Sequence, residues 1–289
     1  MDSSTKPLLP RLSHCRAPLT QEVEVLDEHG QRGMTQIPAE RPLTVFVDRR
    51  ELVTLMTLGA EPELLVLGYL RNQRLVDSVH DIDSITVDWD VGAAAVRTRA
   101  GIEDFDRKTA RRVVTTGCGQ GTVFGGLMDE LGSVTLPPPE QARISQRALY
   151  SLLEAMRRQE STYKSAGSVH GCALFTLAAD EARLELFIED VGRHNAIDTL
   201  AGWMWLHGLG GGDKAFYTTG RLTSEMVIKS AQMGVPIVVS RSGITQMGHE
   251  LAAQLGLALF GRATNRHFLC YSGFDRFDSQ PALAARPPA

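Results

Sequence analysis

Residues 43–56 alternate apolar and polar side chains on both sides of the polar run Asp48-Arg49-Arg50. Alternation with a period of two, broken by a short polar run, predicts a β-hairpin. Residues 61–71 predict a helix, because their proline stands in the first turn, where its missing N–H sacrifices no hydrogen bond. A second β pair is predicted at residues 85–89 and 91–99.

The chain after residue 168 alternates short apolar runs with longer amphipathic segments. Residues 172–177 and 184–190 predict an antiparallel strand pair. The elements predicted after this pair are helix 193–206, strand 214–219, helix 222–232, strand 235–240, helix 245–255, strand 257–262 and strand 266–272. Strands that alternate with helices of this length predict a largely parallel sheet covered by helices.

The run Pro137-Pro138-Pro139 is the best candidate for a domain boundary, since consecutive prolines form a stiff connection. An amphipathic helix is predicted after it, at residues 140–159. We therefore expect a flexible arm at 1–22, a β-rich N-terminal region at 23–138, an α/β domain at 139–277 and a tail at 278–289.

Composition excludes several classes of protein. The chain has 289 residues, a formal net charge of -4 and 43% hydrophobic residues, which is typical of a globular protein without general affinity for nucleic acid. We find no uncharged stretch of the roughly 18 residues that span a membrane, and no apolar signal core at the N-terminus. We therefore expect a cytoplasmic protein that contacts neither nucleic acid nor membrane.

Four short segments combine glycine with arginine directly after a predicted strand. They contain Gly192-Arg193, Gly220-Arg221, Arg241-Ser242-Gly243 and Gly261-Arg262. Glycine lets a ligand approach the backbone, and arginine binds oxygens in pairs. Each segment alone is ordinary turn chemistry. Four at the carboxyl ends of neighbouring strands predict one site for a ligand that carries phosphates.

Cys118 is the candidate reactive thiol. It follows a predicted strand at 111–116 and lies between Gly117 and Gly119, so it is sterically open to a partner. A small residue in a tight turn, or a loop that cradles phosphate, explains the same pattern. Apart from Cys15 in the predicted arm, the remaining cysteines, Cys172 and Cys270, lie in apolar strands and are expected to be buried and inert.

His194 and Asp198 are four residues apart on the predicted helix 193–206 and therefore share a face. They are a candidate base and orienting carboxylate, and an ordinary surface or capping pair is equally compatible with the spacing. His170 precedes a strand and is placed at the same end of the sheet. The cysteine spacings match no zinc site, and we expect no catalytic metal.

The run from Glu189 to Ala196, EDVGRHNA, resembles the signature of the formate dehydrogenase accessory sulfurtransferases, the FdhD family. Support comes from Thr219-Gly220-Arg221 with Ser224-Glu225, and from Phe260-Gly261-Arg262 followed by Tyr271-Ser272-Gly273. The resemblance extends in order from about Pro42 to Phe277.

This resemblance implies a cytoplasmic sulfurtransferase, usually a homodimer, with a cytidine-deaminase-like mixed sheet covered by helices. Such proteins accept persulfide sulfur from a cysteine desulfurase. They pass it to the molybdenum or tungsten bis-guanine-dinucleotide cofactor that formate dehydrogenase receives. Cys118 matches the first position of the family's Cys-x-x-Cys loop and is the expected persulfide carrier.

The expected cofactor-binding residues come from two sources. The resemblance assigns the segment Phe260, Gly261, Arg262, Ala263, Thr264 and Asn265. The strand-end pattern adds Arg193, Arg221 and Arg241, with His194 as a further candidate that tunes the thiolate. A guanine nucleotide such as GDP is expected to mimic the cofactor.

One position departs from the family pattern, because Gly121 replaces the second cysteine of the loop. Persulfide transfer needs a single nucleophile, so the sulfur carrier is our leading hypothesis. The substitution raises the alternative of a chaperone that delivers the cofactor without sulfur chemistry. A second alternative is a cysteine hydrolase that uses Cys118, His194 and Asp198.

Overall fold

A computed structural model describes residues 8–105 and 134–284 of the chain, and the predicted strand 111–116 lies outside these residues. The first part contains a five-stranded sheet in the order β1-β6-β7-β4-β5. Its strands are β1 (Arg11–Leu12), β4 (Arg41–Val47), β5 (Arg50–Thr57), β6 (Ile82–Asp88) and β7 (Ala93–Thr98). Helix α1 (Pro62–Asn72) packs on this sheet, and a 3-10 turn (Val79–Asp81) precedes β6.

The predicted hairpin at 43–56 is confirmed as β4 and β5, which pair antiparallel. Asp48 and Arg49 form its turn with φ of 47° and 72°. The polar run therefore marks the reversal because its residues accept the left-handed backbone of a two-residue turn. Leu43, Val45 and Val47 alternate into the core beneath the sheet and are almost completely buried.

The segment expected to be a flexible arm is partly ordered. Strand β1 pairs parallel with β6. The Ser13 hydroxyl and the Cys15 backbone N–H both donate to Oε1 of Glu63, at 2.5 and 2.7 Å. Glu63 lies on α1 and is 2% exposed, and a buried carboxylate requires hydrogen-bond donors. The residues around Ser13 and Cys15 provide them and are therefore fixed, although their composition predicted a flexible arm.

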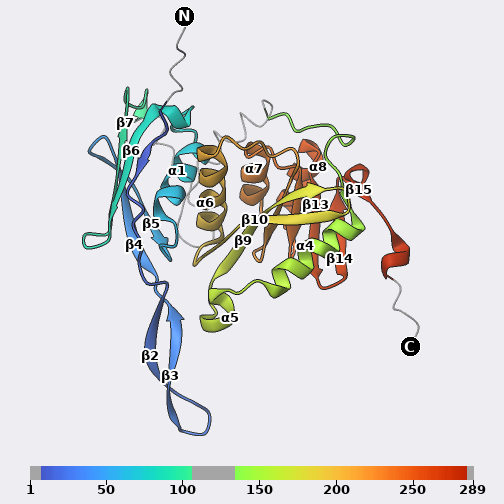
Figure 1. Ribbon diagram of the computed structural model, residues 1–289, viewed down its shortest axis with the longest axis horizontal. Helices are drawn as coiled ribbons and strands as arrows, with labels where there is room; N and C mark the ends of the chain where they lie inside the picture. Colours follow the sequence, from blue (N-terminus) through green and yellow to red (C-terminus); the bar gives the residue numbers. More distant parts are fainter. Residues whose placement is uncertain (1–7, 106–133, 285–289) are drawn as a thin grey trace, which may run out of the picture.

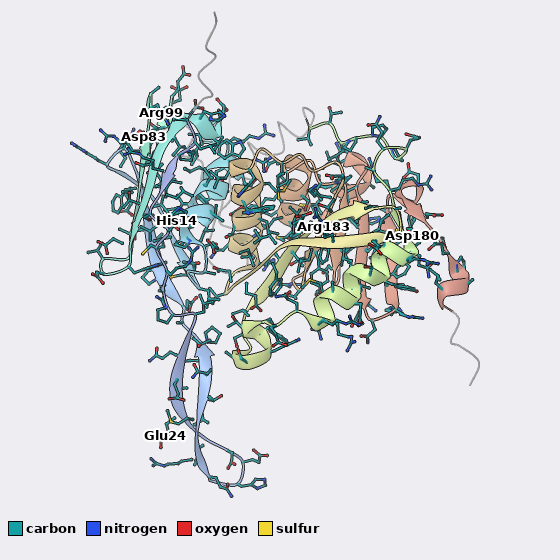
Figure 2. The ribbon with its side chains drawn as sticks, viewed as in Figure 1. His14, Glu24, Asp83, Arg99, Asp180 and Arg183 are labelled. Carbon is teal, nitrogen blue, oxygen red and sulfur yellow. The ribbon has the colours of Figure 1, made fainter. Side chains whose placement is uncertain are left out.

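Strands β2 (Thr20–Leu26) and β3 (Arg32–Pro38) form a separate two-stranded hairpin. Figure 1 shows this hairpin projecting away from the rest of the molecule. Glu24, labelled in Figure 2, pairs with Arg32 across the two strands at 3.3 Å.

The second part contains a six-stranded sheet in the order β10-β9-β11-β12-β13-β14. Its strands are β9 (His170–Ala178), β10 (Glu181–Asp190), β11 (Lys214–Thr218), β12 (Ile237–Ser240), β13 (Ala258–Thr264) and β14 (His267–Ser272). The three strands β11, β12 and β13 are parallel to one another, and the other three run antiparallel to their neighbours. The expected mixed sheet is confirmed, and its relation to cytidine deaminases stays a prediction.

Helices cover both faces of this sheet (Figure 1). They are α4 (Gln146–Arg158) on one face and α6 (Arg193–Leu206), α7 (Ser224–Gln232) and α8 (Gln246–Leu255) on the other. The short helix α5 (Thr162–Ala166) lies beyond the strand ends, beside β3. Alternate residues of each strand enter two different cores: Phe216 packs toward α6, α7 and α8, whereas its neighbour Tyr217 packs toward α4. No helix in the described part of the chain is long and apolar enough to cross a membrane.

The predicted helix 140–159 begins six residues later than expected. Ile144 and Ser145 form strand β8, which pairs with strand β15 (Phe277–Asp278). The Ser145 hydroxyl then accepts the backbone N–H of Ala148 and caps α4. Two short 3-10 turns, Phe274–Arg276 and Pro281–Ala284, flank β15. The domain boundary near residue 138 stays a prediction.

The two parts meet where α1 crosses α6. A Cβ atom added to Gly68 would lie 1.7 Å from the Asp198 carbonyl oxygen, and one added to Gly202 would lie 2.0 Å from the Leu64 carbonyl oxygen. Only glycine lets two helix backbones approach this closely. The crossing therefore fixes the N-terminal sheet against the helix that carries the signature sequence.

Candidate functional site

The carboxyl ends of β10, β11, β12 and β13 and the amino end of β9 lie at one edge of the six-stranded sheet, as the strand register requires. A cavity of about 360 Å³ opens at this edge. Helices α4 and α5 contribute its outer wall, with Arg157 and Lys164 among the lining residues. Ligand sites of open α/β sheets form at this position.

Four of the expected cofactor-binding residues line this cavity: Arg241, Ala263, Thr264 and Asn265. Arg241 directly follows β12, and the other three come from the end of β13 and the turn after it. Segments that are distant in sequence therefore contribute to one concave surface because their strands are neighbours. Arg241, Arg157 and Lys164 give this surface three cationic side chains.

Arg193 and Arg221 lie at the same edge without lining the cavity. Burial lowers the pKa of His170, and the charges of Arg193 and Arg221 lower it further. His170 immediately precedes Gly171, which lines the cavity. The backbone of Gly220 packs against the Arg193 side chain, where an added Cβ would lie 2.9 Å from Cδ. The two arginines thus extend the positive charge beside the cavity.

In the segment from Phe260 to Arg262, the first residue lies in the core and the last lies on the surface. The Phe260 side chain is fully buried and makes edge-to-face contacts with two other rings, so its side chain supports the sheet instead of facing a ligand. Gly261 is closely packed: an added Cβ would lie 2.9 Å from the Tyr271 ring. Arg262 is exposed with φ of 50°, and its backbone N–H donates to the Ser242 carbonyl at 2.8 Å.

His194 belongs to a buried network of polar side chains. Its Nε2 lies 3.4 Å from Glu225, and Lys229 Nζ lies 3.7 Å from Glu225 and 2.9 Å from Asp198. Asn72 of α1 donates to Asp198 at 2.7 Å. Burial and the charge of Lys229 lower the pKa of His194 to about 2.

The structure therefore pairs His194 with Glu225 and pairs Asp198 with Lys229. This arrangement differs from the base and orienting carboxylate that their spacing suggested. An imidazole with so low a pKa is also a poor proton acceptor near neutral pH. The geometry of these two residues gives no support to a cysteine hydrolase.

Two acidic residues of the signature have structural roles that the sequence analysis did not assign. Asp190 accepts hydrogen bonds from the Thr57 hydroxyl, the Leu58 N–H at 3.1 Å and the Asn195 amide at 2.8 Å. It therefore connects β5 to the start of α6. Glu189 instead accepts two backbone N–H groups of α5. Their position in the EDVGRHNA sequence was the only indication that these two residues matter. Which elements they connect depends on the tertiary contacts.

The expected persulfide carrier Cys118 and the departure at Gly121 lie outside the described residues. Cys172 is fully buried, and burial raises the pKa of its thiol to about 12. Burial also raises the pKa of Cys270 to about 11. The prediction of a buried, inert thiol is confirmed for Cys172, whereas Cys270 is only partly buried, although its raised pKa also disfavours the thiolate. Within the described ranges, no group of three His, Cys, Asp or Glu side chains could hold a metal ion.

Comparison with known proteins places the chain in a family. A model described as the FdhD/NarQ family matches residues 38–278. The sulfur carrier protein FdhD of Bacillus subtilis is 33% identical over 238 residues, which cover 82% of this chain and 88% of that protein. The protein of the same name from Listeria innocua is 29% identical over 243 residues, covering 84% and 91% of the two chains.

A solved structure supports the same relationship. A protein from Desulfotalea psychrophila, described as a formate dehydrogenase accessory protein, is 25% identical and aligns with a TM-score of 0.70. The alignment covers 90% of this chain and all of the other. The EDVGRHNA sequence, the sheet that carries it and these comparisons agree: the chain belongs to the FdhD/NarQ family.

Proposed function

We propose that this protein is a sulfur carrier in the maturation of formate dehydrogenase. Cys118 receives persulfide sulfur from a cysteine desulfurase and passes it to the molybdenum or tungsten bis-guanine-dinucleotide cofactor. This cofactor is the cargo of the reaction, and the protein acts as a homodimer in the cytoplasm. Membership of the FdhD/NarQ family and the names of the relatives support the proposal.

The observation that carries the proposal is the cationic cavity at the carboxyl edge of the sheet. Arg157, Lys164 and Arg241 line it, and the charges of Arg193 and Arg221 act on His170 beside it. The cargo carries two pyrophosphate groups, whose oxygens are well matched to arginine side chains. The Thr219 hydroxyl, which accepts the Gly171 N–H at 3.0 Å, offers a further donor at the strand ends.

The sulfur transfer to Cys118 is a displacement at sulfur. The Cys118 thiolate attacks the outer sulfur of the donor persulfide, a new S–S bond forms, and the donor's S–S bond breaks. The donor cysteine leaves as a thiolate, so the step needs no external oxidant or reductant. Because one nucleophile suffices, Gly121 in place of the second loop cysteine is compatible with this step.

Intact mass after incubation with a cysteine desulfurase, cysteine and pyridoxal phosphate tests the carrier. We expect a mass gain of one sulfur atom in the wild-type protein, reversed by a reductant and absent in Cys118→Ala. In cells, Cys118→Ala should abolish formate dehydrogenase activity. Full activity of that variant would exclude Cys118 as the carrier.

Gly121 favours a second candidate, a chaperone that delivers the cofactor without sulfur chemistry. The mass experiment separates the two functions when it is combined with nucleotide binding. A folded wild-type protein that binds GDP but never gains sulfur would support the chaperone.

Binding of GDP, measured by calorimetry, tests the assignment of the cavity. Arg241→Ala should weaken binding roughly tenfold or more, because a phosphate oxygen loses a charged donor. Arg183→Ala is the matched control, since Arg183 is exposed and paired with Glu185 by the β9–β10 turn. Figure 2 labels Arg183 and Asp180 at this opposite end of the strand pair. Equal affinities of the two variants would argue against the cavity.

A further inference from the structure

The cavity contains one carboxylate, Glu189, among the cationic side chains of Arg157, Lys164 and Arg241. Glu189 is 8% exposed at the end of β10. A negative charge in a site for an anionic ligand opposes binding by simple Coulomb repulsion. We therefore expect Glu189 to make a structural contribution to the site that is larger than the loss of binding free energy from this repulsion.

The contacts of Glu189 identify that task. Its Oε1 accepts the backbone N–H of Tyr163 at 3.1 Å, and its Oε2 accepts the backbone N–H of Thr162. Both groups belong to the first turn of α5, where N–H groups have no partner inside the helix. A carboxylate at this position is favourable for the helix, and its charge is partly balanced by the two donors.

Helix α5 also lies beside strand β3 and the end of α4. It contains five residues, none of them buried. It is followed by Gly167 and Ser168, both with positive φ, of 67° and 52°. At the cavity wall, the ammonium group of Lys164 donates to the Arg157 carbonyl at the end of α4, at 3.2 Å. Apolar burial therefore contributes little to the placement of α5.

The start of α5 also separates two cavities. Ser161, Phe187 and Glu189 line both the 360 Å³ cavity and a neighbouring cavity of about 530 Å³. The neighbouring cavity is lined by Arg16 and Leu19, near the base of the β2–β3 hairpin. Figure 1 shows α5 between the end of α4 and the start of this hairpin. Displacement of α5 would join the two spaces.

We propose that Glu189 is a positioning residue that holds α5 across the nucleotide cavity, so that Tyr163 and Lys164 form its outer wall. This inference rests on the proposed function for the identity of the ligand, a guanine nucleotide. The two hydrogen bonds of Glu189 fix the first turn of α5, next to its contacts with β3 and α4, and they require no ligand. The carboxylate is retained because a defined wall improves binding more than its charge weakens it.

Hydrogen–deuterium exchange of the ligand-free protein tests the placement. Glu189→Gln keeps the side chain's size but presents an amide NH₂ to one of the two N–H donors. We expect exchange across residues 160–168 to accelerate roughly tenfold, with the core strands unchanged. Glu160→Gln is the matched control, because it removes a charge next to α5 from a side chain that lines the neighbouring cavity. Unchanged exchange in Glu189→Gln would overturn the proposal.

The Kd for GDP is a second test, because a positioning role and simple charge repulsion predict opposite changes in it. The proposal predicts that Glu189→Gln raises the Kd roughly tenfold, and that Glu189→Asp does so as well because its shorter side chain cannot reach α5. A carboxylate that acts only through repulsion predicts tighter binding for Gln and no change for Asp. Tighter binding in the Gln variant would overturn the proposal.

Failure of the proposed function gives a different result. A wild-type protein that binds no GDP would contradict the nucleotide site, while faster exchange in Glu189→Gln would still support Glu189 as the residue that positions α5.

Discussion

Neighbouring residues of the EDVGRHNA sequence perform separate tasks in the structure. Glu189 holds α5, Asp190 contacts β5, and Gly192 is the N-cap of α6. His194 enters a buried network with Glu225 and Lys229. The EDVGRHNA sequence therefore joins β10 and α6, which carry it, to α5, β5 and α7, and it also borders the cavity. Each substitution within it should therefore have a distinct effect.

Lys229 is the central cation of the buried network and is 2% exposed. Lys229→Met should lower the free energy of unfolding by about 3–5 kcal/mol, because Asp198 and Glu225 lose their buried counter-charge. Urea unfolding followed by tryptophan fluorescence measures this change. Addition of Asp198→Asn should recover part of the loss, since one unpaired charge is removed. The control is Arg183→Ala, which breaks an exposed ion pair with Glu185 and should change the free energy of unfolding little.

At the scale of elements, local signals located the longer helices but missed the five-residue α5, and long-range pairing shifted the start of α4. Helix α6 begins and ends where predicted, at Arg193–Leu206, because Gly192 and Gly208 bound it in the sequence. Helix α4 begins later than predicted because β8 pairs with β15, which is more than 130 residues away. Strand β1 was missed for the same reason, since it pairs with β6 and the residues after it, Ser13 and Cys15, donate to Glu63.

The crossing of α1 and α6 depends on two glycines. Gly202→Ala should lower the free energy of unfolding by about 3 kcal/mol or more, because its Cβ would lie 2.0 Å from the Leu64 carbonyl oxygen. Thermal and urea unfolding measure the loss. Gly33→Ala is the control: the space around Gly33 is open within 4 Å, so the effect should stay within about 1 kcal/mol. Similar losses in both variants would contradict the proposed close approach.

At the scale of the whole molecule, two sheets with separate cores are joined through buried polar contacts. Asn72 of α1 reaches Asp198 of α6, and Asp190 reaches Thr57 at the end of β5 and Leu58 directly after it. Asp198 also belongs to the buried network of Lys229, Glu225 and His194. Titration of these buried groups links the free energy of unfolding to pH. His194 is the clearest case, because burial lowers its pKa to about 2 from the ordinary value of 6.5.

Acidification should destabilise the protein through His194. Below pH 6.5 the unfolded chain binds a proton at this histidine and the folded chain does not, so protonation favours the unfolded state. Between pH 7 and pH 5 the free energy of unfolding should fall by about 2 kcal/mol more in the wild type than in His194→Gln. Urea titrations at several pH values measure the difference. The exposed His29→Gln should retain the wild-type slope, and equal slopes for all three proteins would contradict a neutral buried His194.

The sequence by itself indicated most helices and strands of the second part and the four strand-end segments, but not α5, β8 or β15. Its resemblance to a family indicated the mixed sheet, where periodicity alone predicted a largely parallel one. The predicted elements and strand-end segments depend on periodicity, glycine and proline, which act over a few residues, whereas the family resemblance depends on the EDVGRHNA sequence and its supporting motifs. Only the tertiary structure decided that Arg241, Thr264 and Asn265 share a cavity while Phe260 belongs to the core. It also replaced Asp198 with Glu225 as the partner of His194. Spacing along a helix identifies residues on one face, whereas the choice of partner depends on which helix packs against that face.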